Sequence, residues 1–359
     1  MTTCAVCRYM RVKKKYSGLH QEADVKLKRK MRKFQFLIGL LINIGLMNLF
    51  SSCTNSEEKM AGIEGISFEN YPKVDGSTSA RALNVMVACK LLGIHYHWQE
   101  PYYTIDIVPN GEWNVEAKME DMPQKYRYDF FSRRVVTSQT HGAFMNLIDG
   151  NVDIILTHRT ISSDEKAHAD DIGITLIESS IASDAFVFIV CDDNPIKSLT
   201  TNDIQKIYTK EITNWLQVGG NDEDIVVYTR PRNSGSEEVF RVLVMNGLEP
   251  ADFPERAEIM DMNFVFSEVV HNRYSICYTF NNYKDMIARV PDNIVSKIAV
   301  NGIFPDKNTV KNRTYPFISE VHVAIRSDID RHSMAYKLYE WLHSEDAKST
   351  LTECGFIPK

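Results

Sequence analysis

Three stretches of the chain share one pattern, in which small polar residues come directly before an amphipathic helix. Apolar positions recur at helical spacing after residues 75–80, after 137–143 and after 234–236. Gly93 and Gly150 follow the first two helical patterns, where a left-handed residue typically ends a helix. The pattern predicts three helices, each beginning at a loop rich in hydroxyl and backbone N–H groups.

Apolar runs of strand length alternate with these and further helical patterns. Residues 152–156, 182–190 and 225–228 are typical of buried strands. Strands that alternate with helices, without long repeats, predict an α/β chain with largely parallel sheets. A chain of 359 residues with 44% apolar composition can bury a substantial core, and we expect two lobes.

Segment 95–134 differs from the rest by its aromatic content. It includes Trp98, Tyr102, Tyr103, Trp113, Tyr126, Tyr128, Phe130 and Phe131. Residues 104–108 alternate like a strand, and Asn110-Gly111 is a strong hairpin signal before residues 113–117. The segment is predicted to be a hairpin insertion that packs on one lobe, and an aromatic partner surface is the alternative.

Charge divides the chain into a basic start and an acidic body. Residues 1–52 hold 11 of the 41 Lys/Arg and 2 of the 47 Asp/Glu, so the remaining residues carry 30 bases and 45 acids, a net charge of −15. A body this acidic is a poor partner for nucleic acid or anionic lipid, and we predict no nucleic-acid partner. Any anion it binds must be held by a local concentration of donors.

The basic start has the marks of a lipoprotein signal peptide. A basic cluster at 28–33 precedes a mostly apolar run at 34–50, which ends in small residues and Cys53. Residues 31–52 are therefore predicted to be the signal, and Cys53 to be lipidated and to anchor the protein to a membrane of the cell envelope. A plain cleaved signal with an incidental Cys53 is the alternative.

The flanking stretches follow from this assignment. Such signals begin close to their basic cluster, so Met31 is the expected start. Residues 1–30 would then be an upstream extension that is not native or is disordered. Residues 53–65 are polar and predict a short tether.

The cysteines and histidines indicate no metal site and no cofactor. The spacing of the body cysteines fixes no pairing, and we expect buried free thiols at Cys89, Cys191, Cys277 and Cys354. The Cys4/Cys7 pair falls in the upstream extension. His95 and His97 alternate as a ligand pair could, but no third ligand accompanies them.

Residues 230–236 carry the most specific chemistry. Side chains alternate in an extended segment, so Arg230 and Arg232 could project two guanidinium groups to one side. Ser234, Gly235 and Ser236 fall where a helix begins, with free N–H groups that favour an anion. These features are typical of an oxyanion receptor.

Arg159 is a further candidate. It follows the predicted strand 152–156, at the end of the strand where α/β sheets place ligands. A surface arginine is the alternative for this residue.

Five motifs occur in the order found in PstS-like phosphate-binding proteins of ABC importers. They are Asp75-Gly76-Ser77-Thr78-Ser79, residues 157–165, Ile212-Thr213-Asn214-Trp215 with Gly219-Gly220, the loop from Arg230 to Ser236, and Ile276-Cys277-Tyr278. The resemblance runs from about residue 66 to 359 and implies the type II periplasmic-binding-protein fold, in which two α/β lobes joined by a hinge close on a ligand cleft. We expect one lobe to comprise 66–180 and 275–359, with the insertion 95–134, and the other lobe to comprise 181–274.

The resemblance also implies the site residues. Thr78 matches the first-loop hydroxyl donor of the family, Thr140 the donor at the second helix, and Arg230 the ligand-binding arginine. The full predicted set is Ser77, Thr78, Ser79, Thr140, Arg159, Arg230, Arg232, Ser234, Gly235 and Ser236.

Two positions depart from the family pattern. Arg232 stands where many members have a carboxylate, and Arg159 where some have an aspartate. Such carboxylates accept a hydrogen bond from the protonated oxygen of hydrogen phosphate and repel sulfate. An oxyanion ligand is therefore predicted, with phosphate the first choice and selectivity against sulfate left open.

The implied function is that of a lipid-anchored binding protein that captures phosphate or a similar oxyanion for an ABC permease, without bond chemistry. A surface interaction or sensing lipoprotein with the same fold is one alternative. A serine hydrolase acting through Ser77, Ser79 or Ser234 is another, although no Gly-x-Ser-x-Gly motif is present and no motif places a histidine as base.

Overall fold

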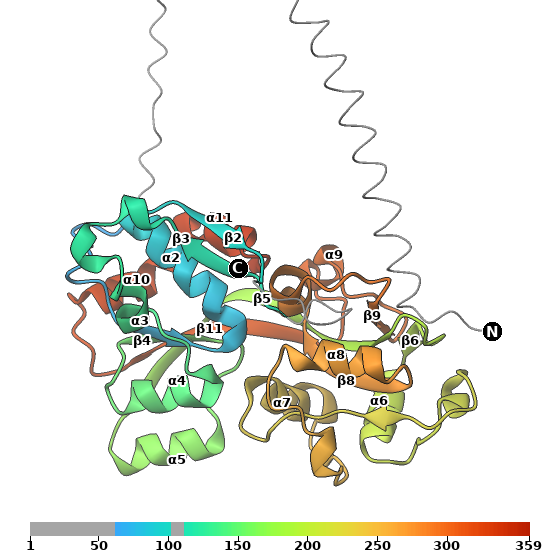
Figure 1. The fold of residues 1–359 in the computed structure, drawn as a ribbon. Coiled ribbons are helices and arrows are strands. Elements are labelled where there is room, and N and C mark those ends of the chain that lie inside the picture. Colours follow the sequence, from blue (N-terminus) through green and yellow to red (C-terminus); the bar gives the residue numbers. More distant parts are fainter. Residues whose placement is uncertain (1–61, 102–110) are drawn as a thin grey trace, which may run out of the picture. The chain divides into compact units, whose positions relative to one another are not determined.

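A mixed sheet forms the centre of the protein (Figure 1). The computed structural model describes residues 62–101 and 111–359, which belong to one compact unit of the chain. The strands of the central sheet run in the order β1-β4-β11-β5-β8-β7, and β12 and β9 also pair with β5. They are β1 (Val74–Gly76), β4 (Ile154–Thr157), β5 (Leu176–Cys191), β7 (Val226–Val227), β8 (Ser275–Phe280), β9 (Val295–Lys297), β11 (Ile318–Arg326) and β12 (Ile357–Pro358).

The long strand β5 belongs to two halves of this sheet. Residues 176–185 of β5 pair with β11, whereas residues 186–190 pair with β8. We call β1, β4, β11 and β12, with the start of β5, the first half; β7, β8 and β9, with the end of β5, are the second half. The residue boundaries predicted for the two lobes stay a prediction.

Helices cover both halves, and β5 and β11 run between them (Figure 1). Around the first half lie α2 (Arg81–Leu92), α4 (Gln139–Ile148), α5 (Ser163–Asp171), α10 (Met334–Trp341) and α11 (Glu345–Glu353). Around the second half lie α6 (Thr201–Tyr208), α7 (Gly235–Val239) and α8 (Phe264–His271). Shorter helices are α3 (Phe130–Arg134) and α9 (Lys307–Lys311), with single turns or π-type segments at η1 (Thr78–Ala80), η2 (Met119–Asp121), η3 (Gln124–Tyr126), η4 (Trp215–Val218), η5 (Phe240–Met245), η6 (Glu255–Ala257) and η7 (Tyr283–Ala288).

The predicted helix starts and ends are confirmed where the local signals were strong. Gly93 ends α2 with φ 68°, and Gly150 follows α4 with φ 74°. Thr200 caps α6, because its hydroxyl accepts a hydrogen bond from the Asp203 N–H.

The prediction of largely parallel sheets is wrong. Strand β1 pairs with β4, and β7 with β8, in parallel. However, β11 is antiparallel to both β4 and β5, and β5 is antiparallel to β8. The reason is that β5 and β11 run between the two halves in opposite directions, and alternation along a strand does not reveal its direction.

The described part of the insertion contains an antiparallel hairpin. Strand β3 (Asn114–Ala117) pairs antiparallel with β2 (Tyr96–Gln99). Residues 104–108, the predicted partner, lie outside the described residues. Val115 is buried and β3 contacts α2, so the described part of the insertion packs on the first half. A further small sheet pairs β6 (Ser198–Leu199) with β10 (Ala299–Val300).

Each half has its own apolar core. In the first half, Phe144 and Leu147 of α4 pack with Ile155 of β4. In the second half, the ring of Phe240 stacks on Tyr278 with centroids 4.6 Å apart.

Buried free thiols are confirmed at Cys89, Cys191, Cys277 and Cys354. Burial raises the pKa of the Cys277 thiol to about 12, so this thiol stays protonated. The Cys4/Cys7 pair, the predicted signal 31–52 and Cys53 lie outside the described residues.

Candidate anion-binding site

The first loop, residues 75–79, is tied to the second loop by Asp75. The Asp75 carboxylate is buried and accepts hydrogen bonds from the Gly76 N–H (2.7 Å), the Ser138 N–H (2.8 Å) and the Asn146 side-chain amide (2.9 Å). A Cβ at Gly76 would lie 2.5 Å from the Leu156 carbonyl oxygen, so only glycine allows this close approach to β4. The sequence placed Asp75 in a motif but indicated no role for it.

Two of the three predicted hydroxyls of the first loop bind a histidine instead of facing solvent. The Ser79 hydroxyl lies 2.8 Å from Nδ1 of His158, and the Ser77 hydroxyl lies 3.2 Å from the Ser79 hydroxyl. Both serines are buried. Thr78 is partly exposed, and its hydroxyl makes no hydrogen bond to another described residue. Thr78 is therefore the hydroxyl of this loop that is available to a ligand.

The second loop presents backbone N–H groups at the start of α4. Gln139 adopts φ 61°, a left-handed conformation that is strained for a residue with a side chain. Ser138 before it has φ −101° and ψ 18°. This succession resembles the backbone concavities that bind anions, and the first N–H groups of α4 have no partner within the helix. Thr140 follows directly and is buried.

The third loop contains a turn that separates the two predicted arginines. The Ser234 N–H donates to the Pro231 carbonyl oxygen at 2.8 Å, and the Ser234 hydroxyl caps α7 by accepting from the Glu237 N–H at 3.2 Å. Arg230, before the turn, is buried, whereas Arg232, within it, is exposed. The predicted extended segment is thus replaced by a turn, and the two guanidinium groups lie in different surroundings.

The second and third loops meet where α4 and α7 begin. A Cβ at Gly235 would lie 2.3 Å from the Thr140 Oγ1 and 3.1 Å from its Cβ, so the two helix starts are in direct contact. Ser236 extends this contact, because its hydroxyl accepts from the Arg230 Nε at 3.4 Å. Together with Asp75, these contacts join all three loops and Arg230 in one continuous region.

The Arg230 guanidinium is buried and has no carboxylate partner. It is 8% exposed, and its Nη1 donates to the Ile259 carbonyl oxygen at 2.6 Å. No Asp or Glu of the described chain forms an ion pair with it. Burial lowers the pKa of Arg230, but an arginine remains charged at neutral pH because its ordinary pKa exceeds 12. A buried charge without a partner is costly, and an anion would relieve that cost.

Tyr278, from the last family motif, fixes the backbone of this arginine. Its hydroxyl accepts from the Arg230 N–H at 3.1 Å and donates to the Glu237 carboxylate. Burial raises the pKa of Glu237, against hydrogen bonds from Tyr278 and Arg241 that lower it. Glu237 is thus occupied by protein donors.

Arg159, in contrast, already has a carboxylate. Its Nη1 and Nη2 donate to the two oxygens of Glu165 at 2.8 and 2.7 Å, and both side chains are buried. The guanidinium also lies over the Phe144 ring at 5.0 Å. Glu165 accepts further from the Ser162 N–H at the start of α5. The charge of Arg159 is therefore neutralised within the protein.

Ser79 is not an accessible nucleophile. Ser79 Oγ, His158 and Asp184 follow one another, but His158 Nε2 lies 3.7 Å from the Asp184 carboxylate, beyond hydrogen-bond distance. Asp184 accepts instead from the Ala185 and Asn282 N–H groups. Ser79 is only 2% exposed, so a substrate carbonyl does not reach it.

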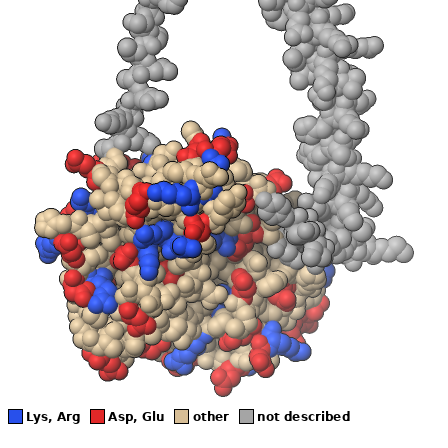
Figure 2. Space-filling model, turned by 60° about the vertical axis from the view of Figure 1, so that its left-hand side comes forward, with Lys and Arg blue, Asp and Glu red and all other residues tan. Residues whose placement is uncertain are grey.

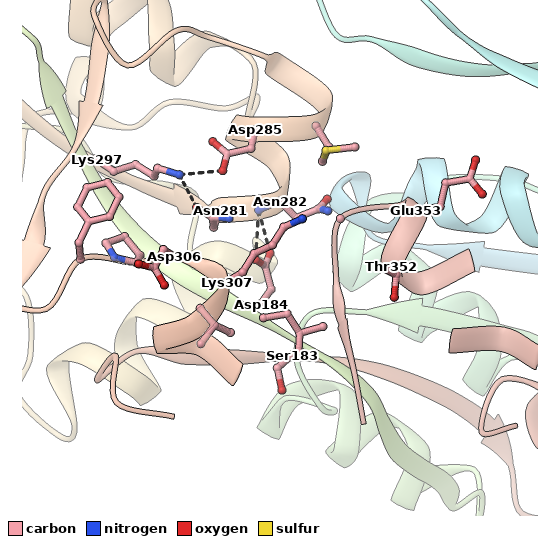
Figure 3. A pocket seen from close by; sticks show the side chains of 16 residues that line it. Ser183, Asp184, Asn281, Asn282, Asp285, Lys297, Asp306, Lys307, Thr352 and Glu353 are labelled. Atoms are coloured by element: carbon pink, nitrogen blue, oxygen red, sulfur yellow. Dashed lines mark hydrogen bonds and ion pairs between the residues drawn. The ribbon is translucent and has the colours of Figure 1, made fainter. Parts of the chain in front are cut away.

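A cavity of about 390 Å³ lies beside β5 and is lined by Ser183 and Asp184 of that strand (Figure 3). None of the predicted site residues lines it. Lys297, one of its walls, donates to Asn281 at 2.7 Å and to Asp285 at 2.8 Å, as Figure 3 shows. Because none of the predicted donors reaches this cavity, we assign the candidate anion site to the three loops.

Metal binding and membrane spanning find no support in the described chain. Residues 62–101 and 111–359 contain no cluster of three or more His, Cys, Asp and Glu that could hold a metal ion. No helix in these ranges is both long and apolar enough to cross a membrane. On the face shown in Figure 2, acidic and basic side chains are interspersed.

Comparison with known proteins identifies the family. Residues 116–345 match the family described as "PBP superfamily domain", so the chain belongs to the PBP superfamily. The "Phosphate-binding protein PstS" of Bacillus subtilis is 27% identical over 184 residues, which are 51% of this chain and 58% of that protein. The similarity therefore spans less than two thirds of that relative.

Solved structures show the same fold. One is a putative phosphate ABC transporter substrate-binding protein with bound phosphate from Clostridium perfringens, 21% identical, with a TM-score of 0.53 over 82% of this chain and all of that one. Another is an ABC-type phosphate transport receptor from Vibrio cholerae, 23% identical, with a TM-score of 0.54 over 80% of this chain and all of that one. The type II periplasmic-binding-protein fold is confirmed, as a mixed α/β chain with a large central sheet.

Proposed function

We propose that this protein captures phosphate or a closely related oxyanion and delivers it to an ABC permease, without breaking any bond. One observation carries the proposal: the buried Arg230 guanidinium has no carboxylate in the described chain and lies where α4 and α7 begin. An anion there would neutralise the charge of Arg230. It would also accept hydrogen bonds from the first N–H groups of the helices, which have no partner within the helix.

The proposed donors divide into two groups. Arg230, Thr78 and the backbone at Thr140 and Gly235 are proposed to contact the ion. Ser77, Ser79, Ser234 and Ser236 are proposed to hold the loops in position, because their hydroxyls already bind protein groups. Arg159 is proposed to stabilise the fold through Glu165.

The selectivity of the site follows from the donors it offers. Arg232 and Arg159 stand where a carboxylate would accept a hydrogen bond from the protonated oxygen of hydrogen phosphate. Without that carboxylate, the site does not distinguish hydrogen phosphate from sulfate by its proton. We therefore propose that phosphate and sulfate both bind, with phosphate preferred by the relationship to phosphate-binding proteins. In the same proposal, Cys53 is a lipid anchor in the cell envelope and no cofactor takes part.

Isothermal titration with phosphate, sulfate and a phosphate monoester tests the function. Phosphate should give heat, and at a free concentration a hundred times its Kd it should raise the free energy of unfolding by about 2.7 kcal/mol. No heat with any of the three ions would reject an oxyanion site. Hydrolysis of an ester that stops with a serine-directed inhibitor would instead support an enzyme.

A further inference from the structure

The insertion is anchored on the first half of the protein by its hairpin. Strand β3 contacts α2, and the Lys118 N–H donates to the His95 carbonyl oxygen at 2.8 Å, beyond the β2–β3 pairing. Val115, in the middle of β3, is buried. The hairpin therefore moves with α2, the helix that follows the first loop.

The other end of the hairpin contacts η7. The Trp113 N–H donates to the Ile287 carbonyl oxygen at 2.8 Å. The Arg289 guanidinium carbon lies 3.9 Å from the centre of a Trp113 ring and 4.7 Å from a Trp98 ring. An arginine against two indoles is a specific cation–π arrangement, because tryptophan is the strongest aromatic partner for a cation.

Glu112 makes a second link between the same elements. Its carboxylate pairs with the guanidinium of Arg81, the first residue of α2, and accepts a hydrogen bond from the Tyr283 hydroxyl of η7. Tyr283 is fully buried, and the Glu112 side chain is 13% exposed. Arg81 directly follows η1 of the first loop, so this link lies next to the candidate site.

The segment η7 is connected to the second half, and Asn282 directly before it also donates to the Cys354 carbonyl oxygen, next to the first half. This segment follows β8, whose residues pair with positions 186–190 of β5. The Tyr283 ring stacks against Phe266 of α8 with centroids 6.2 Å apart, and α8 packs on β8 and β9. The insertion thus contacts both halves, which β5, β11 and the contact between Gly235 and Thr140 also connect.

We propose that the described hairpin, residues 96–99 and 112–117, is a clasp that holds the first and second halves closed over the candidate site through Arg289 and Glu112. In a fold that opens about a hinge, contacts made only in the closed state raise its population and slow the escape of a ligand. The closure is a property of the ligand-free protein, and only its effect on release depends on the proposed function.

The test uses the full chain with Arg289→Gln, and Glu112→Gln as an independent second variant. Arg331→Gln is the matched control, since its guanidinium lies 5.8 Å from the Tyr336 ring within the first half. In ligand-free protein, hydrogen exchange should become faster at 111–117 and 283–290. It should also become faster at 138–144 and 234–240, where the first and second halves meet. Phosphate should leave the variants about 3- to 30-fold faster in stopped-flow experiments, the range expected for a lost cation–π contact. The control should change neither readout.

Faster exchange confined to 111–117 and 283–290, with unchanged exchange at 138–144 and 234–240, would overturn the clasp. Such a result would make the contact a local packing feature. If the wild-type protein binds no phosphate, the proposed function fails. The exchange comparison in ligand-free protein still decides whether the hairpin holds the two halves together.

Discussion

Arg159 and Arg230 are equally buried, at 8% exposure each, but the protein treats their charges differently. Arg159 donates both Nη groups to Glu165, whereas Arg230 finds a carbonyl oxygen at Ile259 and the hydroxyl of Ser236. At the first, the chain supplies the negative charge itself. At the second, no Asp or Glu of the described residues supplies it, and we propose that a ligand does.

Local structure explains this difference. Glu165 lies three residues after Ser162 and is already part of the capping box that begins α5, so it is held where Arg159 can reach it. Arg230 is followed by a turn, and the position two residues later is Arg232, which is exposed. Burial alone therefore does not distinguish a structural arginine from a binding one; the identity of the partner does.

The largest expected effect comes from removing the carboxylate at the first arginine. Glu165→Ala should lower the free energy of unfolding by about 3–5 kcal/mol, because it leaves the Arg159 charge buried and unpaired. Urea denaturation measures this loss. The double variant Arg159→Leu/Glu165→Leu is the control and should recover much of the stability, since an apolar pair replaces the ion pair. A single variant as stable as the wild type would show that Arg159 does not depend on Glu165.

The second arginine should show the opposite behaviour. Arg230→Ala should weaken phosphate binding by about 2–4 kcal/mol, as expected for a lost buried donor to an anion, while the ligand-free protein unfolds no more easily. Titration calorimetry and denaturation measure the two quantities. Arg232→Ala removes a charge from the same loop and should leave affinity unchanged. If the Arg230 variant bound phosphate as tightly as the wild type, Arg230 would not be a ligand-binding residue, and it would not differ from Arg159 in this respect.

The contact between the loops should have an intermediate effect. Gly235→Ala adds a Cβ that meets the Thr140 side chain, and such overpacking typically costs about 1–3 kcal/mol. Because the contact joins the starts of α4 and α7, the loss should appear in phosphate affinity measured by calorimetry. Unchanged affinity would mean that the two helix starts can separate without disturbing the site.

The smallest effect is expected at Arg232. Arg232→Asp should change the affinity for phosphate and for sulfate by less than about 0.5 kcal/mol, as is usual for an exposed side chain. Parallel titrations with the two ions measure this. A loss of sulfate binding far greater than the loss of phosphate binding would indicate that Arg232 contacts the ligand after all.

Local signals in the sequence were sufficient for the starts and ends of the helices at the first two loops. Gly93 and Gly150 end their helices as predicted, because a left-handed residue after a helix needs no tertiary context. Pro231 and Asn233 are typical turn residues and indicated the turn from Pro231 to Ser234. The segment was nevertheless predicted to be extended, so that the turn was missed. Which of the predicted site residues contact the ligand remains a proposal.

Tertiary features could not be predicted in the same way. The pairing of Arg159 with Glu165 depends on where α5 packs relative to β4. The role of Asp75 depends on a loop 63 positions later in the chain. Strand direction in β5 and β11 also leaves no trace in the hydrophobic pattern, because alternation is the same in both directions.

The length of β5 determines whether the two halves of the protein can be produced as separate fragments. One uninterrupted strand of 16 residues supplies hydrogen-bond partners to both halves of the sheet, so a cut at its midpoint would leave each fragment with an unpaired strand edge. Open edges of this kind promote self-association. The lobes should accordingly be insoluble when produced as separate fragments, even though each has an apolar core of its own.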